Sequence, residues 1–220
     1  MLLDRSQYEY LCFLIKKLLE TRLKDILLNR TTNRLRFKDL SGKMFTFPVE
    51  SNTHHVVLSP ETNKIFFAVT VCLRAFSDIS RAQSLFSLSL PSTDNGFLIY
   101  KQKQGDESNV WNSVCATWDA STGLAQLWVN GIPSSRKGIK AGSSLTGAPK
   151  IILGQEQDSY GMLTDVHMWD SVLSPHQIVY YTYGGTFQPG NVLNWNSLEF
   201  SRNGYVVTES KETSHKAGNG

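Results

Sequence analysis

The sequence lacks any segment that predicts a membrane-spanning helix. A bilayer needs about 20 consecutive apolar residues, whereas the apolar stretch near the N-terminus, Leu11–Ile15, gives way at once to Lys16 and Lys17. The same stretch is shorter than the apolar region of a secretory signal, which has about 7–15 residues. Only 19% of the residues are charged and 40% are hydrophobic, with 7 prolines, which excludes gross disorder. We therefore expect one sizeable globular domain with an appendage and no transmembrane segment.

Cysteine is scarce as well, with Cys12, Cys72 and Cys115 alone among 220 residues. Three cysteines are too few for a disulfide-framework miniprotein, and no C-x-x-C pair is present for zinc or redox chemistry. Cys72 and Cys115 each lie in an apolar, strand-like run. Two such strands could place the two thiols face to face, or each could be a buried free thiol. The pattern leaves both possibilities open.

Catalytic motifs are absent too. The 5 histidines form neither H-E-x-x-H nor a metal-binding tandem. A Gly-x-Ser-x-Gly nucleophile motif and a phosphate-binding glycine loop are also missing. His167 lies beside Trp169 on a predicted strand, where a packed side chain is the expected role. We therefore expect no enzyme activity.

The first 40 residues differ from the rest. Their apolar residues follow the spacing of an amphipathic helix, at Leu11, Ile15, Leu18, Leu19, Leu23, Ile26 and Leu27. The basic residues between them lack the aromatic interleaving of a nucleic-acid-binding module, so no nucleic-acid partner is expected. Asn29-Arg30-Thr31 is a glycosylation sequon that matters only in a secreted chain. We assign residues 1–40 to a helical N-terminal extension of unknown role.

From Lys43 onward the apolar period changes to two, which is typical of strands. Predicted strands are Met44–Phe47, His55–Leu58, Ile65–Phe76, Leu85–Leu90, Phe97–Tyr100, Val114–Trp118, Leu124–Val129, Lys150–Leu153 and Met162–Trp169. Pro48 is expected to end the first of them, and Thr93–Gly96 is expected to be a turn. Many short strands separated by turns predict an all-β antiparallel sandwich or jelly roll over residues 41–209. Residues 210–220 are expected to be a disordered tail.

Two local signals are stronger than the rest. Asn130-Gly131 predicts a two-residue hairpin turn, in which both residues need positive φ. Ser174-Pro175 predicts a helix start with Ser as N-cap and Pro in the first turn. The helix should run from His176 to Tyr183 and end at Gly184-Gly185.

One loop gathers oxygen-bearing side chains, in the stretch Leu153–Leu163, which reads LGQEQDSYGML. Calcium takes 6–8 oxygens from carboxylates, amides and main-chain carbonyls. Glu156, Asp158 and the carbonyl of Gln157 could supply several, and Asp94-Asn95 could add a carboxylate and an amide. Two ordinary polar turns would have the same composition, so spacing alone leaves both interpretations open.

A jelly-roll glycoside hydrolase is a further alternative, because Glu156 and Asp158 alternate as catalytic carboxylates do on one strand face. Such a pattern should continue with a third carboxylate, but Ser159, Tyr160 and Gly161 supply none. The two carboxyl groups of a retaining enzyme must also lie about 5–5.5 Å apart, which spacing alone does not establish.

Several separated segments together resemble the pentraxin family. In chain order they are Phe67–Asp78, Ser84–Ser87, Asp94-Asn95, Val114–Trp118, Gly154–Gly161, Met168–Asp170 and Leu173–Pro175. The likeness is to the short pentraxins and runs from about Gly42 to Thr208. It implies a two-sheet jelly roll with one helix, lectin-like in architecture.

The resemblance also implies a function. Short pentraxins are secreted innate-immune and acute-phase proteins that assemble as cyclic homo-oligomers, usually pentamers. They bind phosphocholine, phosphoethanolamine or related ligands, carbohydrates among them, through calcium, and some engage complement. Carried over by position, the resemblance implies a Cys72–Cys115 disulfide, calcium ligands at Asp94, Asn95, Glu156, Gln157 (main-chain oxygen) and Asp158, and a wall beside the ligand headgroup at Tyr100.

The sequence departs from the family pattern at three places. Ser113 stands where the family signature has His. Only 14 residues separate Tyr100 from Cys115, so the stretch that carries the family's ligand-facing acid is missing. Met162 follows Gly161 directly, without the family's loop that completes a second calcium site.

These departures predict a reduced calcium site. Two adjacent calcium ions carry four positive charges, whereas this chain offers three carboxylates, those of Asp94, Glu156 and Asp158. We expect one calcium ion, an incomplete second site and weakened phosphocholine binding. The alternative is a truncated or splice-variant pentraxin with impaired or no ligand binding.

Overall fold

The structure is a computed structural model, and it describes residues 37–60, 64–77, 82–102, 110–154 and 159–211. Contacts divide the chain into two units, Met1–Lys38 and Asp39–Gly220. All of the strands and the helix within the described residues belong to the second unit. The helical extension predicted over residues 1–40 lies almost wholly outside the described residues and stays a prediction.

The described residues form strands at nearly every place that the period-two pattern predicts. The strands are β1 (Lys43–Ser51), β2 (His55–Ser59), β3 (Ala68–Phe76), β4 (Gln83–Leu90), β5 (Thr93–Lys101), β6 (Asn112–Asp119), β7 (Leu124–Val129), β8 (Ile132–Pro133), β9 (Lys137–Gly138), β10 (Lys150–Leu153), β11 (Ser159–Trp169), β12 (Glu199–Asn203) and β13 (Val207–Ser210). The helix within these residues is α2 (Pro175–Tyr183). None of the described helices is both long and apolar enough to cross a membrane.

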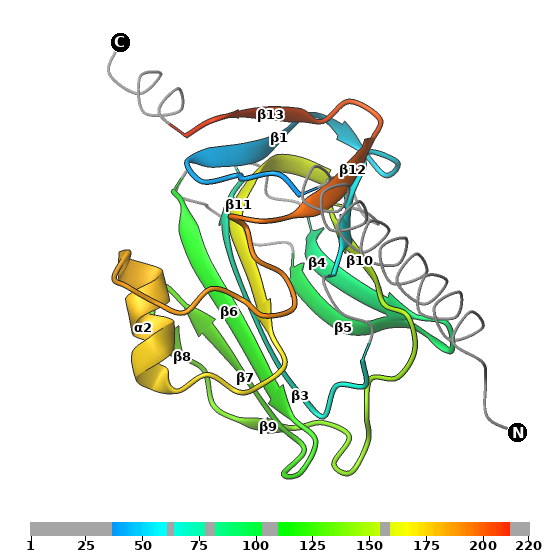
Figure 1. The fold of residues 1–220 in the computed structure, drawn as a ribbon, viewed down its shortest axis with the longest axis vertical. Coiled ribbons are helices and arrows are strands. Elements are labelled where there is room, and N and C mark those ends of the chain that lie inside the picture. The colour runs from blue at the N-terminus through cyan, green and yellow to red at the C-terminus, as the bar shows by residue number, and fades with distance from the viewer. Residues whose placement is uncertain (1–36, 61–63, 78–81, 103–109, 155–158, 212–220) are drawn as a thin grey trace, which may run out of the picture. The chain divides into compact units, whose positions relative to one another are not determined.

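The strands form two antiparallel sheets (Figure 1). The larger sheet has the order β13-β1-β11-β3-β6-β7-β8, with β9 also paired to β7, and the smaller has the order β12-β2-β10-β4-β5. Apolar side chains from both sheets, such as Phe45, Leu73, Phe86 and Ile151, form one buried cluster. The predicted all-β sandwich with one short helix is therefore confirmed.

A second buried cluster lies on the other face of the larger sheet. Successive side chains of β3 alternate between the two clusters: Val71 and Leu73 belong to the first cluster and Cys72 belongs to the second. This is the alternation that a strand imposes on its side chains. α2 covers this face, on the side of the sheet away from β4 and β5 (Figure 1). The helix thus buries Ile178 and Tyr181 against the sheet.

The local signals for the helix and the hairpin are confirmed. Ser174 is the N-cap of α2, and its side chain and that of Gln177 form a reciprocal capping box. Gly184 ends the helix with φ of 75°. Asn130 and Gly131 have φ of 51° and 79° between β7 and β8, as the two-residue turn requires.

Two turn predictions were wrong. Pro48 lies within β1 instead of ending it. Regular pairing of β1 with β11 is interrupted between Phe47 and Ser51, so no ladder hydrogen bond is required from the position of Pro48, which lacks an N–H. Thr93–Gly96 belongs to β5, because Thr93 already pairs with Leu90 and the chain reverses at Pro91 and Ser92.

The C-terminal end of the domain also extends further than expected. β13 includes Ser210, and Lys211 donates to the Gly42 carbonyl. The Lys211 ammonium bonds both oxygens of Asp165, at 2.6 and 2.7 Å. Residues 212–220 lie outside the described residues.

His167 is a packed side chain beneath α2. It pairs with Cys72 across β11 and β3 and is only 2% exposed. Its ring lies among those of Trp169, Tyr181 and Phe187, and Nδ1 accepts a hydrogen bond from the Gly190 N–H at 3.3 Å. Burial lowers the pKa of this imidazole to about 4, more than the Asp165 carboxylate raises it.

This burial predicts an acid-sensitive fold. Unfolded His titrates near pH 6.5, whereas folded His167 stays neutral down to about pH 4. Between these values the unfolded chain binds more protons, so the free energy of unfolding falls as the pH falls, by about 3 kcal/mol in all. Denaturant titrations from pH 7.5 to pH 4 measure this loss. The variant His167→Asn keeps an acceptor for Gly190 but does not titrate, so its pH profile should be flatter; equal slopes would contradict the assignment.

Candidate functional site

The structure places three of the predicted site residues on β5. Asp94 and Asn95 lie exposed near the start of the strand, and Tyr100 lies exposed near its end. Asn95 has φ of 51°, its Oδ1 accepts from Ser87 Oγ at 2.6 Å, and its N–H donates to Ser89 Oγ at 3.2 Å. The amide oxygen predicted to bind calcium is therefore already held by a hydroxyl of β4.

The other predicted ligands, Glu156, Gln157 and Asp158, lie outside the described residues. The residues that border them are Gly154, which follows β10, and Ser159, which begins β11. Ile152 pairs with Ser87, so Gly154, two residues further along the chain, lies beside Leu85 of the antiparallel strand β4. Gly154 accordingly lies in a small pocket with Gln83, Ser84 and Leu85.

The described residues of the predicted calcium site lie beside β4. Asn95 is bonded to Ser87 and Ser89 of this strand, and Gly154 lies beside Leu85 of the same strand. At about 3.3 Å per residue, Ser87 and Leu85 lie roughly 7 Å apart along the strand. Among the described residues no group of three His, Cys, Asp or Glu side chains is placed to hold a metal ion.

The predicted disulfide is present. Cys72 and Cys115 are directly opposite each other in the β3–β6 register and are bonded, closing a sequence separation of 43 residues. Both sulfurs belong to the cluster beneath α2. The alternative of two free thiols is thereby excluded in this structure.

The position where the family signature has His is occupied by a buried serine. Ser113 pairs with Arg74 across β6 and β3, and its hydroxyl donates to Thr182 Oγ1 at 3.3 Å. The Arg74 guanidinium bonds the carbonyls of Tyr181 and Thr182, at 3.1 and 2.9 Å. These contacts tie the C-terminal end of α2 to the sheet.

An ionic cluster beside this helix end was missed by sequence reasoning. Asp165 has φ of 54° at an irregularity in β11, and its carboxylate lies within 3.4 Å of Arg74 and 2.6 Å of Lys211. The Tyr181 hydroxyl donates to the Asp165 carbonyl at 2.7 Å, and burial raises the pKa of this phenol. The three charged residues come from distant parts of the chain, so no local sequence motif predicts that they form a cluster.

A cleft of about 480 Å³ opens between the two sheets beside β5. Its lining comes from both layers and includes Gly96, Phe97, Leu98, Ala116, Trp118, Leu127, Lys137 and Lys140. Within the described residues β5 is the last strand of its sheet, so the sandwich is uncovered there. The short connection between Tyr100 and Cys115 leaves few residues to cover it.

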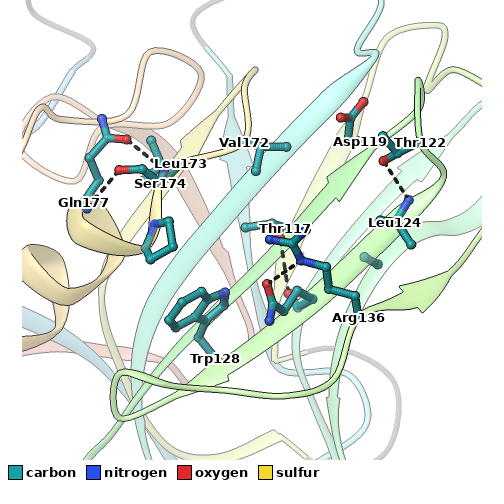
Figure 2. Close-up of a pocket in the computed structure, with 13 residues that line it drawn as sticks. Thr117, Asp119, Thr122, Leu124, Trp128, Arg136, Val172, Leu173, Ser174 and Gln177 are labelled. Carbon is teal, nitrogen blue, oxygen red and sulfur yellow. Dashed lines mark hydrogen bonds between the residues drawn. The ribbon is translucent and has the colours of Figure 1, made fainter.

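A second pocket, of about 360 Å³, lies on the outer face of the larger sheet, at the N-terminal end of α2 (Figure 2). β6 and β7 supply Thr117, Asp119 and Trp128, and the helix end supplies Ser174 and Gln177. Sequence reasoning did not identify this pocket, because its residues come from separate segments that only the fold brings together.

Comparison with known proteins gives consistent results. A model of the Pentaxin family matches residues 43–110 and 103–210. The chain is 42% identical over 202 residues to the serum amyloid P-component of Cavia porcellus, covering 79% of this chain and 89% of that protein. It is 41% identical over 196 residues to that of Homo sapiens, covering 77% and 87%. The first alignment spans 202 positions, which is more than 79% of the 220 residues of this chain. The alignment therefore includes positions at which the relative has a residue and this chain has none.

Solved structures resemble the chain in fold. A native heptameric SAP-like pentraxin from Limulus polyphemus superposes with a TM-score of 0.68 at 20% identity, covering 78% of this chain and 96% of that chain. A putative carbohydrate-binding protein from Bacteroides ovatus gives a TM-score of 0.52 at 15% identity, covering 77% and 60%. At these identities the likeness concerns the sandwich alone.

Proposed function

The chain belongs to the pentraxin family, and from that membership we propose that it is a secreted, non-enzymatic binding protein of innate immunity. We propose further that it binds phosphocholine-type, phosphoethanolamine-type or carbohydrate ligands through calcium. The observation that carries the proposal is the family match over residues 43–210, together with about 40% identity to serum amyloid P-components. Assembly as a homo-oligomer belongs to the same proposal, in keeping with the heptameric pentraxin that shares the fold.

In this proposal one calcium ion is held by carboxylate and amide oxygens. Glu156 and Asp158 would contribute carboxylates and Gln157 its main-chain oxygen, with Asp94 and Asn95 completing the set. Tyr100, exposed on the same strand as Asp94, would contact the ligand headgroup.

A second candidate is a pentraxin with impaired or no ligand binding. The sequence favours it, because the short stretch between Tyr100 and Cys115 lacks the family's ligand-facing acid. The Asn95 side-chain oxygen is also bonded to Ser87, so calcium would have to replace that hydrogen bond. Phosphocholine would then find no calcium site on this chain.

Calcium titration distinguishes the two candidates. If the site works, calorimetry should give one calcium per chain, and calcium at 100 times Kd should stabilise the fold by about 2.7 kcal/mol because it binds only the native state. For a domain of this size that is a rise in Tm of roughly 5–10 °C. Asp94→Asn, which removes one of three carboxylates, should weaken calcium binding about 10-fold or more.

The matched control is Asp119→Asn, because that carboxylate lies outside the proposed ligand set and bonds Ser121 in its own turn. Its calcium affinity should equal that of the unmodified chain. An unchanged melting curve at millimolar calcium would establish the second candidate instead. Two tight calcium ions per chain would contradict the reduced site.

A further inference from the structure

Trp128 carries a buried donor that has no partner. The side chain is 6% exposed, on β7 opposite Cys115, and its indole N–H makes no hydrogen bond within the described residues. By contrast, the N–H of Trp118 donates to the Ile139 carbonyl at 2.8 Å, and that of Trp169 to the Gln188 carbonyl at 3.1 Å. Buried indole donors are normally satisfied, so Trp128 and Trp195, whose N–H groups have no partner among the described residues, are exceptions, and Trp128 lines a pocket.

The unpaired donor belongs to the pocket at the N-terminal end of α2. Figure 2 shows the nitrogen-bearing edge of Trp128 turned toward Thr117 and the Arg136 guanidinium. An indole N–H and a guanidinium can only donate hydrogen bonds. A ligand that meets both must therefore present an acceptor, and Arg136 favours a negatively charged one.

The charges around the pocket also favour a negatively charged ligand. Arg136 donates to Gln126 Oε1 at 3.4 Å and has no carboxylate within ion-pair distance among the described residues. The N-terminal end of a helix carries partial positive charge, and Ser174 and Gln177 of that end line the pocket. Asp119 is the opposing charge, but its carboxylate already accepts two hydrogen bonds from Ser121, at 2.8 and 2.7 Å.

Apolar side chains form much of the remaining wall, from Leu124, Val172, Leu173 and Pro175. The volume, about 360 Å³, is within the usual range for small-ligand sites. We infer that this pocket binds an organic carboxylate carried on an apolar body. The carboxylate accepts from Trp128 and pairs with Arg136, while the apolar body lies against the wall between α2 and β7. The same chemistry occurs in a free fatty acid and at the C-terminus of an apolar peptide.

Nuclear magnetic resonance of the indole N–H groups tests the inference directly. Titration of the ¹⁵N-labelled chain with hexanoate should move the Trp128 indole proton downfield and saturate, since a new hydrogen bond forms at that atom. Trp195 is the internal control: its indole N–H is also buried and unpartnered among the described residues, but it lies in the main core away from the pocket. Hexanamide, which lacks the charge, should bind about 10-fold more weakly.

Two variants test the assigned roles. Arg136→Gln, at an exposed position, should weaken hexanoate binding about 5- to 10-fold and leave the fold intact. Asp119→Asn should strengthen it about 2-fold, because a like charge is removed. Trp128→Phe removes one indole N–H resonance and so identifies the resonance of Trp128. If Trp128→Phe fails to fold, Arg136→Gln still tests the proposal.

A peptide arm identifies the source of the carboxylate. N-acetyl-Leu-Leu is compared with its C-terminal amide; tighter binding of the acid than of hexanoate indicates a peptide C-terminus, and the reverse order indicates a free acid. If no carboxylate moves the Trp128 resonance, or if all 5 indole resonances move together without saturation, the inference is wrong. Retained affinity in Arg136→Gln would equally overturn it.

Discussion

Replacing both Cys72 and Cys115 with alanine should lower the free energy of unfolding by about 4 kcal/mol. The bond closes a sequence separation of 43 residues, and a crosslink over a loop of that length restricts the unfolded chain by about this amount. The two sulfurs also pack in the cluster beneath α2 with Trp128 and Tyr181, so the variant loses contacts there as well. Urea denaturation measures the change, and Tm should fall by roughly 10 °C.

The control for this experiment is the third cysteine. A Cys12→Ala background leaves only the paired cysteines, so that reductant acts on one bond alone. In that background, reduction should reproduce most of the loss seen in the double variant. Equal unfolding free energies with and without reductant would contradict a stabilising disulfide.

The second large effect is expected from Gly161→Ala, at least about 3 kcal/mol of destabilisation. Gly161 has φ of 106°, which a side chain rarely adopts. A Cβ at this position would lie 2.2 Å from the Phe76 carbonyl oxygen, and that oxygen belongs to the backbone of β3 and cannot rotate away. Either β11 or β3 must shift, which disturbs the pairing of Met162 with Phe76.

Two matched glycines separate the causes of this loss. Gly42 has φ of 67°, but a Cβ added there would meet nothing within 4 Å, so Gly42→Ala should cost only about 1 kcal/mol, the cost of the backbone conformation. Gly138 has open space and no positive φ, so Gly138→Ala should be close to neutral. Thermal and urea unfolding of the three variants give the comparison. A loss for Gly161→Ala no larger than that for Gly42→Ala would exclude the clash with Phe76.

The position of Gly161 also bears on the proposed calcium site. Gly161 follows Ser159 and Tyr160 at the start of β11, immediately after the proposed calcium ligands Glu156–Asp158. The close approach to Phe76 fixes where the chain re-enters the sheet. In the proposed function, that anchor fixes the C-terminal end of the ligand-bearing segment.

Local chemistry explains what could be predicted from the sequence. Period-two apolar patterning predicted most strands, because burial on alternate faces acts residue by residue. Asn130-Gly131 predicted a hairpin, and Ser174-Pro175 predicted the start of α2, because turn and cap preferences depend only on neighbouring residues. The Cys72–Cys115 bond followed from family resemblance, since the strand pattern alone left two free thiols possible.

Other features depended on partners far away in the chain. Pro48 remains within β1 because regular pairing with β11 is interrupted there. Asp165 meets Arg74 and Lys211, which are distant in sequence, only after β11 has paired with β3 and β1 with β13. The strand register, which no local pattern specifies, sets the distance between Asn95 and Gly154.

The sequence by itself thus determined the sandwich class, the helix and its caps, and the residue types available for a calcium site. Only the tertiary structure decided which of those residues are neighbours. It placed Asn95 against Ser87 and Ser89 of β4, and it built a pocket around the unpaired indole of Trp128. The physical reason is that strand and turn preferences are local, whereas a binding site requires side chains from several strands to converge, and convergence is set by pairing and packing across the whole sheet.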